Sequence, residues 1–278
     1  MKAIRIHNYG GPEVLQYEDA PRPKPQAGEV LIRVHAAGVN PIDWKVREGH
    51  MKDFWPHKFP LILGWDLSGV VEELGRGVSR FKIGDEVYSL PDPTRNGAYA
   101  DYIVVRESEL ALKPNSLHHI RAAAVPLAAL TAWQSLFDTA QLQPGQRVLI
   151  HAGSGGVGHF AVQLAKWKGA HVFATASTKN QDLLRELGVD EPIDYTQQRF
   201  EDVARNIDIV LDTHRRRNAG TLLVSFEKGR RSRFVSPAAV GRESRRTRRP
   251  GRDLVARNRA ARSSQRSRRS STRASSRR

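Results

Sequence analysis

A run of small residues between two apolar segments constrains this chain more than any other feature. Arg147–Ala152 is a short apolar run typical of a buried strand, and Val157–Lys168 has apolar residues at helical spacing. Between them, small side chains would let the backbone turn sharply and approach a phosphate at the start of the helix. A plain tight turn is the alternative, but the flanking strand and helix favour a dinucleotide site. The residues at the spacing of a G-x-G-x-x-G-type fingerprint are Ala152, Gly155 and Gly158, and Gly156 and Val157 lie between them in the same predicted turn.

The neighbouring segments predict an α/β chain with two domains. Residues 1–118 hold short alternating runs separated by Gly, Pro and Asp, which predicts a β-rich, barrel-like domain. Within residues 119–213, apolar strands at 147–152, 171–176 and 207–211 alternate with helices at 119–139, 157–168 and 180–187. Such alternation is typical of a doubly wound parallel sheet, the Rossmann architecture.

Residues 214–278 differ from both predicted domains. They contain 22 of the 45 Lys and Arg residues but three of the 29 acids, a net charge of +19 that leaves −3 for residues 1–213. Arg, Ser and Ala dominate without an apolar period, so we expect a disordered basic tail. The high overall charge therefore belongs to the tail, and it gives no reason to expect a specific nucleic-acid partner for the body.

The end of the second apolar strand bears on the choice of cofactor. A site for NAD usually has an acid there, about 20 residues after the glycines, to bind the ribose hydroxyls. This chain has Ser177 and Lys179 instead, and a hydroxyl and a cation suit the 2′-phosphate of NADPH. A solvated lysine in a polar loop is the alternative for Lys179 alone, but the missing acid favours NADPH.

Over residues 1–213 the sequence resembles the zinc-independent, quinone-oxidoreductase-like branch of the medium-chain dehydrogenases/reductases. The motifs that carry this resemblance are Gly11-Pro-Glu-Val-Leu15, Ala37-Gly-Val-Asn40-Pro-Ile-Asp43, Gly64-Trp-Asp66-Leu-Ser-Gly69, Gly84-Asp-Glu-Val87, Pro126-Leu-Ala-Ala-Leu-Thr131-Ala, Ile193-Asp-Tyr195 and Leu211-Asp-Thr213. The resemblance implies a GroES-like catalytic domain beside the Rossmann domain.

The resemblance also implies roles for individual residues. Ser177 and Lys179 would bind the 2′-phosphate, Tyr195 would lie near the adenosine, and Asn40 and Thr131 would lie beside the nicotinamide. The implied reaction is hydride transfer from NADPH to a quinone or an α,β-unsaturated carbonyl compound. No general acid stands out, since Asp43, Tyr99 and Tyr102 are expected to be packing or surface groups.

The resemblance further implies that no catalytic zinc is bound. Zinc-dependent relatives have a cysteine where this chain has Asn40, and His-Glu where it has Trp65-Asp66. The chain contains no cysteine at all, so thiolate ligands are excluded. We expect Trp65 to fill the corresponding space. The adjacent His118 and His119 are expected to lie in a polar linker and not to form a metal pair.

The sequence also bears on location and assembly. We expect a cytoplasmic protein without a membrane segment, because no apolar run reaches the roughly 18 residues that span a bilayer. A homodimer is compatible with the sequence. Two other functions stay open: nucleic-acid binding through the basic tail, and NADPH binding without turnover, as in a regulatory or crystallin-like relative.

The family resemblance stops at His214, which suggests a shifted reading frame. Residues 214–229 can be encoded so that removing one base gives a segment beginning Ile-Gly-Gly, with which the family continues. Removing two bases before Arg262 similarly gives an amphipathic helix ending at a glycine. An evolved disordered tail is the alternative.

We therefore predict that resequencing the gene finds an inserted or deleted base near the codon for Thr213. A clean read through that codon on several independent templates would contradict the frame hypothesis and favour a tail that is genuinely encoded.

Overall fold

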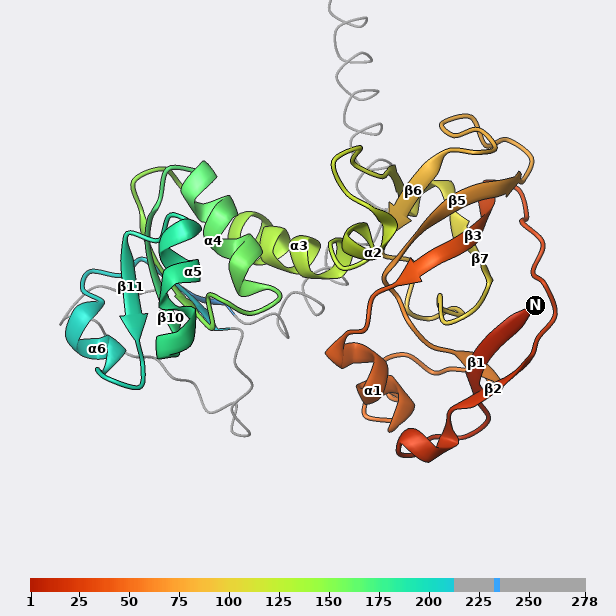
Figure 1. Cartoon of the computed structure of the whole chain (residues 1–278), viewed down its shortest axis with the longest axis horizontal. Helices are drawn as coiled ribbons and strands as arrows, with labels where there is room; N and C mark the ends of the chain where they lie inside the picture. Colours follow the sequence, from red (N-terminus) through yellow and green to blue (C-terminus); the bar gives the residue numbers. More distant parts are fainter. Residues whose placement is uncertain (213–232, 236–278) are drawn as a thin grey trace, which may run out of the picture.

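The computed structural model describes residues 1–212 and 233–235, which form two lobes joined by a helical segment (Figure 1). The first lobe is built from antiparallel β-sheets and the second from a parallel sheet with helices packed against it. The predicted combination of a GroES-like β-rich domain and a Rossmann sheet is confirmed.

The first lobe contains eight strands in two sheets, with strand orders β2-β1-β4 and β7-β3-β5-β6-β8. Their bounds are β1 (Lys2–Ile6), β2 (Gln16–Asp19), β3 (Glu29–Ala37), β4 (Leu61–Ile62), β5 (Leu67–Leu74), β6 (Glu86–Ser89), β7 (Tyr102–Arg106) and β8 (Leu110–Leu112). Alternate side chains of β3 and its neighbours, such as Val30, Ile32 and Val105, form a buried apolar core. This is the pattern expected when one face of an antiparallel sheet is covered.

The second lobe contains a five-stranded parallel sheet with strand order β11-β10-β9-β12-β13. The strands are β9 (Arg147–His151), β10 (His171–Ala176), β11 (Glu191–Asp194), β12 (Ile209–Asp212) and β13 (Arg233–Val235). On β9, Val148 and Ile150 face one apolar cluster while Leu149 faces another. Helices therefore cover both faces of the sheet, which explains why its strands are continuously apolar.

Helices connect and cover these sheets. Their bounds are α1 (Pro41–Arg47), α2 (His119–Ala122), α3 (Pro126–Trp133), α4 (Gly158–Trp167), α5 (Gln181–Glu186), α6 (Phe200–Val203), the π-helical η3 (Gln134–Thr139) and the 3-10 turns η1 (Pro12–Val14), η2 (Glu107–Glu109) and η4 (Thr178–Asn180). Helix α2 lies against β3 and β5, whereas α3 packs against α4, so this segment joins the lobes (Figure 1). The predicted boundary at residue 118 falls just before α2.

The linker segment is more structured than the predicted polar linker. His119 Nδ1 lies 2.8 Å from Ser68 Oγ on β5, and its Nε2 lies 3.1 Å from Glu86 Oε1 on β6. His119 therefore ties α2 to the five-stranded sheet of the first lobe, while His118 is the residue before the helix.

Residues 119–139 also bear on the expected absence of a membrane segment. This 21-residue helical stretch contains an 18-residue window with a mean hydropathy of 1.2, which is long and apolar enough to cross a bilayer by length and composition and which the sequence prediction overlooked. Core helices of soluble proteins pass the same test. In this structure, Ala132 and Leu136 belong to the buried core of the second lobe.

Some predicted elements differ from the observed ones. The helix expected at 119–139 is interrupted between α2 and α3. Helix α1 was not predicted, although Asn40, Pro41 and Asp43 carry an N-terminal helix signature.

The prediction of a disordered tail is wrong for three residues. Arg233–Val235 form β13, which pairs in parallel with β12 at the edge of the second sheet. The remaining residues of the predicted tail and of the proposed frame change, 213–232 and 236–278, lie outside the described residues.

Two adjacent leucines on α5 test the packing of the second lobe. Leu184 is completely buried in the apolar cluster, whereas Leu183 is 38% exposed. We predict that Leu184→Ala lowers the free energy of unfolding by about 2–5 kcal/mol, because it leaves a cavity. Leu183→Ala is the matched control and should change it by less than about 1 kcal/mol. Equal losses in urea unfolding of the two variants would contradict this packing.

Candidate cofactor and active site

The turn between β9 and α4 brings the predicted phosphate contacts together. Ala152 has a positive φ of 52° directly after β9, and the N–H of Gly155 donates to the Ala152 carbonyl at 2.9 Å. Helix α4 then begins at Gly158, with Val157 as its N-terminal cap. All five residues predicted to contact the phosphates therefore lie in one strand-to-helix turn.

The glycines in this turn are required for two different reasons. A Cβ on Gly158 would lie 2.1 Å from the Ala152 carbonyl oxygen, and one on Gly153 would lie 2.8 Å from Ala174 Cβ. These two positions must be glycine for the turn to pack on the strand and on β10. A Cβ on Gly156, in contrast, would meet nothing within 4 Å. Packing does not explain a glycine there, whereas close approach of a ligand to the backbone would.

The start of α4 offers hydrogen-bond donors. Among the described residues, none accepts a bond from the backbone N–H groups of Gly156, Val157 or Gly158. The first N–H groups of a helix lack partners within the helix, and they carry the positive end of its dipole. The turn therefore fits an anionic group such as a pyrophosphate.

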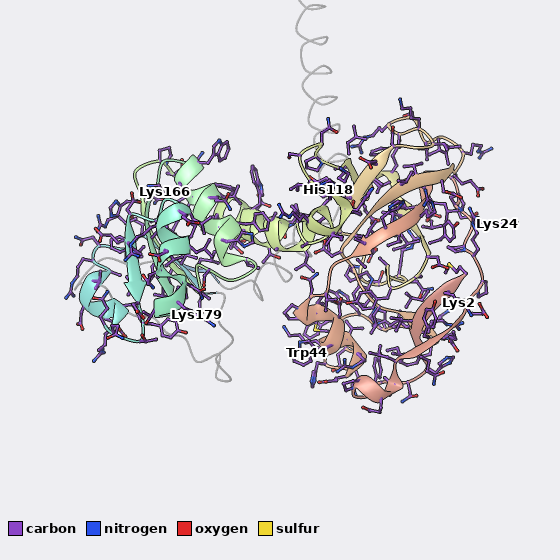
Figure 2. All side chains as sticks on the ribbon, viewed as in Figure 1. Lys2, Lys24, Trp44, His118, Lys166 and Lys179 are labelled. Atoms are coloured by element: carbon purple, nitrogen blue, oxygen red, sulfur yellow. The ribbon has the colours of Figure 1, made fainter. Side chains whose placement is uncertain are left out.

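The ends of β10 and β11 carry the predicted 2′-phosphate and adenosine residues. Ser177 follows β10 directly and is half-buried, and Lys179 is exposed on the next turn. The N–H of Tyr195 donates to the Ala176 carbonyl at 3.2 Å, which places Tyr195 next to Ser177, with its side chain 55% exposed. Figure 2 shows Lys179 at the edge of the second lobe where β10 ends, and Lys166 at the opposite edge.

The acid nearest to this strand end is Asp194 at the end of β11, which the sequence prediction did not consider. Its Oδ1 accepts bonds from the Thr196 N–H at 2.9 Å and from the Thr196 hydroxyl at 2.7 Å. Hydrogen bonds from Thr178 and Thr196 lower the pKa of Asp194, so it is ionised at neutral pH. Thr196 lies in the loop after β11, whereas Thr178 lies on η4 beside Ser177 and Lys179.

A buried carboxylate connects the two residues predicted to lie beside the nicotinamide. Asp66 Oδ2 accepts a bond from Asn40 Nδ2 at 3.0 Å, and Asp66 Oδ1 accepts one from the Leu127 N–H at 3.3 Å. One turn further along α3, the Thr131 hydroxyl donates to the Leu127 carbonyl at 2.7 Å. Asn40 at the start of α1 and Thr131 on α3 are thus joined through Asp66 and Leu127. Asp66 was not among the predicted site residues.

A second buried carboxylate lies on the same side of α1. Asp43 Oδ2 accepts bonds from the Asn40 N–H at 2.7 Å and from the Tyr99 hydroxyl at 2.8 Å, and its Oδ1 has no partner among the described residues. Burial raises the pKa of Asp43 and of Tyr99, and it raises the pKa of Asp66 to about 7. Asp43 and Tyr99 thus bind each other in the interior of the first lobe.

Trp65 occupies the position where zinc-dependent relatives are expected to have a histidine. It is 1% exposed, packs in the core around Ile6, Val46 and Leu61, and donates its indole N–H to the Arg95 carbonyl at 3.0 Å. The described residues contain no group of three or more His, Cys, Asp or Glu side chains that could hold a metal ion. Among the described residues around Asn40, the groups that could act as metal ligands are the Asn40 amide and the carboxylates of Asp43 and Asp66.

A pair of substitutions separates packing from ligand binding in the turn. We predict that Gly158→Ala lowers the free energy of unfolding by at least about 1–3 kcal/mol, because its Cβ would collide with a backbone oxygen. Gly156→Ala should leave stability within about 0.5 kcal/mol, since its Cβ meets nothing. Thermal melts of both variants check this, and similar losses would contradict the described turn.

Curated relatives match most of this chain. It is 42% identical over 201 residues to a chloroplastic quinone-oxidoreductase homolog from Spinacia oleracea, a match that covers 70% of this chain and 61% of that protein. It is 40% identical over 221 residues to a chloroplastic NADPH-dependent alkenal/one oxidoreductase from Arabidopsis thaliana, covering 76% and 57%. The chain thus spans about 60% of the length of these relatives.

The expected cytoplasmic location is wrong by the same comparison. The relatives from Spinacia oleracea and Arabidopsis thaliana are named as chloroplast proteins, and one from Danio rerio is named as mitochondrial. These relatives point to an organelle. Nothing in the composition of residues 1–213 suggested this.

Family models and a solved structure agree with the two lobes. An alcohol dehydrogenase GroES-like domain model matches residues 26–115, and a zinc-binding dehydrogenase model matches residues 156–274, which includes most of the predicted tail. The quinone oxidoreductase from Coxiella burnetii is 40% identical, with a TM-score of 0.69 over 77% of this chain and 68% of that one. The chain belongs to the medium-chain dehydrogenase/reductase family, in its quinone-oxidoreductase-like branch.

Proposed function

We propose that this chain is the larger part of an NADPH-dependent reductase that delivers hydride to a quinone or an α,β-unsaturated carbonyl compound without a catalytic zinc. The observation that carries the proposal is the β9–α4 turn. It combines unpartnered N–H groups at Gly156, Val157 and Gly158 with a glycine at 156 that packing does not require. Both properties suit a pyrophosphate lying against the backbone.

The end of β10 supports NADPH over NADH. Ser177 and Lys179 offer a hydroxyl and a cation, and Lys179 has no ion pair among the described residues. Asp194 is the nearby acid, and its hydrogen bonds to Thr196 and Thr178 hold it away from a ribose-binding role. A 2′-phosphate between Ser177 and Lys179 would form charge-assisted hydrogen bonds, and Tyr195 would cover the adenosine beside it.

The residues near Asn40 support an electron-poor acceptor. When bound, NADPH supplies the hydride, and an enone or quinone accepts it without the alkoxide that a simple alcohol substrate requires a metal to stabilise. Asn40 and Thr131 would orient the nicotinamide side of the cofactor by hydrogen bonds. One relative is named as an alkenal/one oxidoreductase and another as a quinone-oxidoreductase homolog. Both names refer to electron-poor acceptors of this kind.

Two alternative functions depend on different parts of the chain. Nucleic-acid binding would depend on residues 214–278, of which only 233–235 are described, and no described feature favours it. Binding of NADPH without turnover would use the same turn and strand end, so kinetics must distinguish it. A homodimer remains a prediction.

We predict that the full chain binds NADPH more tightly than NADH and that Lys179→Ala weakens NADPH binding by about tenfold, the value of one charge-assisted hydrogen bond. NADH binding should change less than about twofold, because NADH lacks the 2′-phosphate. Isothermal titration calorimetry measures both affinities, and oxidation of NADPH with a quinone and an enone tests turnover.

Lys166→Ala is the matched control for removing one positive charge. Lys166 lies at the opposite edge of the lobe and pairs with Asp190 at 2.7 Å (Figure 2). It should leave both affinities unchanged. A preference for NADH, or an equal effect of the two lysine substitutions on NADPH, would overturn the cofactor assignment. Tight NADPH binding without oxidation by either acceptor would favour the non-catalytic alternative.

A further inference from the structure

Asp66 is a buried carboxylate that lies between the start of α1 and the start of α3 and does not face solvent. It is 0% exposed, and its side chain accepts bonds from Asn40 Nδ2 and from the Leu127 N–H. Its main-chain carbonyl also accepts the Gly38 N–H at 2.7 Å, two residues before Asn40. Asp66 therefore holds the start of α1 and the start of α3 but cannot itself reach a substrate.

We propose that Asp66 is a positioning residue that sets the orientation of the Asn40 side-chain amide, and so determines which end of that amide faces the nicotinamide side. The orientation follows from this chain alone. Its consequence for the cofactor rests on the proposed function.

The chemistry of the two groups sets the orientation of the amide. An ionised carboxylate can only accept hydrogen bonds, so the Asn40 amide must turn its NH₂ group toward Asp66. Its carbonyl oxygen then points to the other side. The bond from Asn40 Nδ2 to Asp66 Oδ2, 3.0 Å long, holds the amide in this orientation. An amide without such a partner could present either end.

Protonation of Asp66 would reverse the orientation. A proton taken from solvent onto Oδ2 makes that atom a donor, and the Asn40 carbonyl oxygen is then the matching acceptor. The amide would turn by about 180° and present its NH₂ group to the nicotinamide side. The bond from the Leu127 N–H to Oδ1 is possible in both states, so α3 need not move.

The surroundings of Asp66 bring its protonation into the neutral pH range. Burial raises its pKa to about 7, while the bonds from Asn40 and Leu127 oppose that effect. The other titratable groups that face it are Asp43 on α1, whose charge also raises the pKa, and Tyr99, which binds Asp43. A carboxylate of ordinary pKa would stay ionised throughout the neutral range.

The test begins without a cofactor. We predict that the side-chain amide resonances of Asn40, assigned in ¹⁵N spectra of the full chain by their loss in Asn40→Ala, shift with pH with a midpoint near 7. In Asp66→Asn, which mimics the protonated state in shape and charge, they should be independent of pH. Gln143, whose side-chain amide donates to the Gln141 carbonyl at 2.9 Å, is the internal control, and its resonances should stay constant over this range.

Stability shows whether Asp66→Asn merely damages the fold. A raised pKa means that ionisation of Asp66 costs stability as pH rises from about 4 through about 7. The variant should therefore melt no lower than the parent chain at pH 8. Asn40 resonances that do not titrate in the parent chain, or that titrate equally in Asp66→Asn, would overturn the proposal.

A double-mutant cycle on NADPH affinity tests the consequence. Asp66→Asn should weaken binding by about tenfold at pH 8, and it should have less than about a twofold effect when Asn40 is already alanine. If Asp66→Asn weakens NADPH binding by the same factor with and without Asn40→Ala, Asp66 acts through the fold and not through Asn40. That result would contradict its positioning role. If the parent chain binds no nucleotide, the proposed function fails, while the amide resonances still decide the orientation.

Discussion

The contact between the Ala152 carbonyl and the α-carbon of Gly158 is the constraint on which the second lobe depends. With no side chain at 158, α4 begins immediately against the end of β9, and Ala161, Val162 and Ala165 then pack on the sheet. The same close turn leaves the N–H groups of Gly156, Val157 and Gly158 without partners among the described residues. The geometry that closes the core on one side therefore opens an anion site on the other.

The first lobe contributes to the site through buried polar groups. Asp66 and Asp43 are both nearly inaccessible, and each accepts hydrogen bonds from residues at the start of a helix. Burying two carboxylates close together is costly unless they are hydrogen-bonded. The raised pKa of Asp66 shows that the cost is not completely offset. Such a group can be retained for function, and the orientation of Asn40 is the function that its contacts indicate.

The sequence was informative where structure is local. The turn at 152–158 and the strands around it could be predicted because glycine spacing and apolar runs act over a few residues. Helix α1 carried an equally local signal in Asn40, Pro41 and Asp43 and could have been found. The three-residue strand β13 could not, because it lies among arginines and serines and forms by pairing with β12.

The role of Asp66 could not be predicted for a different reason. Its partners Asn40 and Leu127 are 26 and 61 residues away along the chain, so their proximity depends on the tertiary fold. Its pKa depends on burial, which composition does not reveal. The predicted cytoplasmic location was wrong because that prediction depended on general composition. The relatives named as chloroplast and mitochondrial proteins carried the relevant information.

The central claim is that the β9–α4 turn binds the pyrophosphate of NADPH. Titration of the ¹⁵N-labelled full chain with NADP⁺ tests it most directly, with the backbone amides of Gly156, Val157 and Gly158 as reporters and those of Gly84 in the first lobe as a control. The account predicts that the three reporters shift together and saturate while Gly84 stays constant. Saturable nucleotide binding that leaves the three amides unchanged would contradict it.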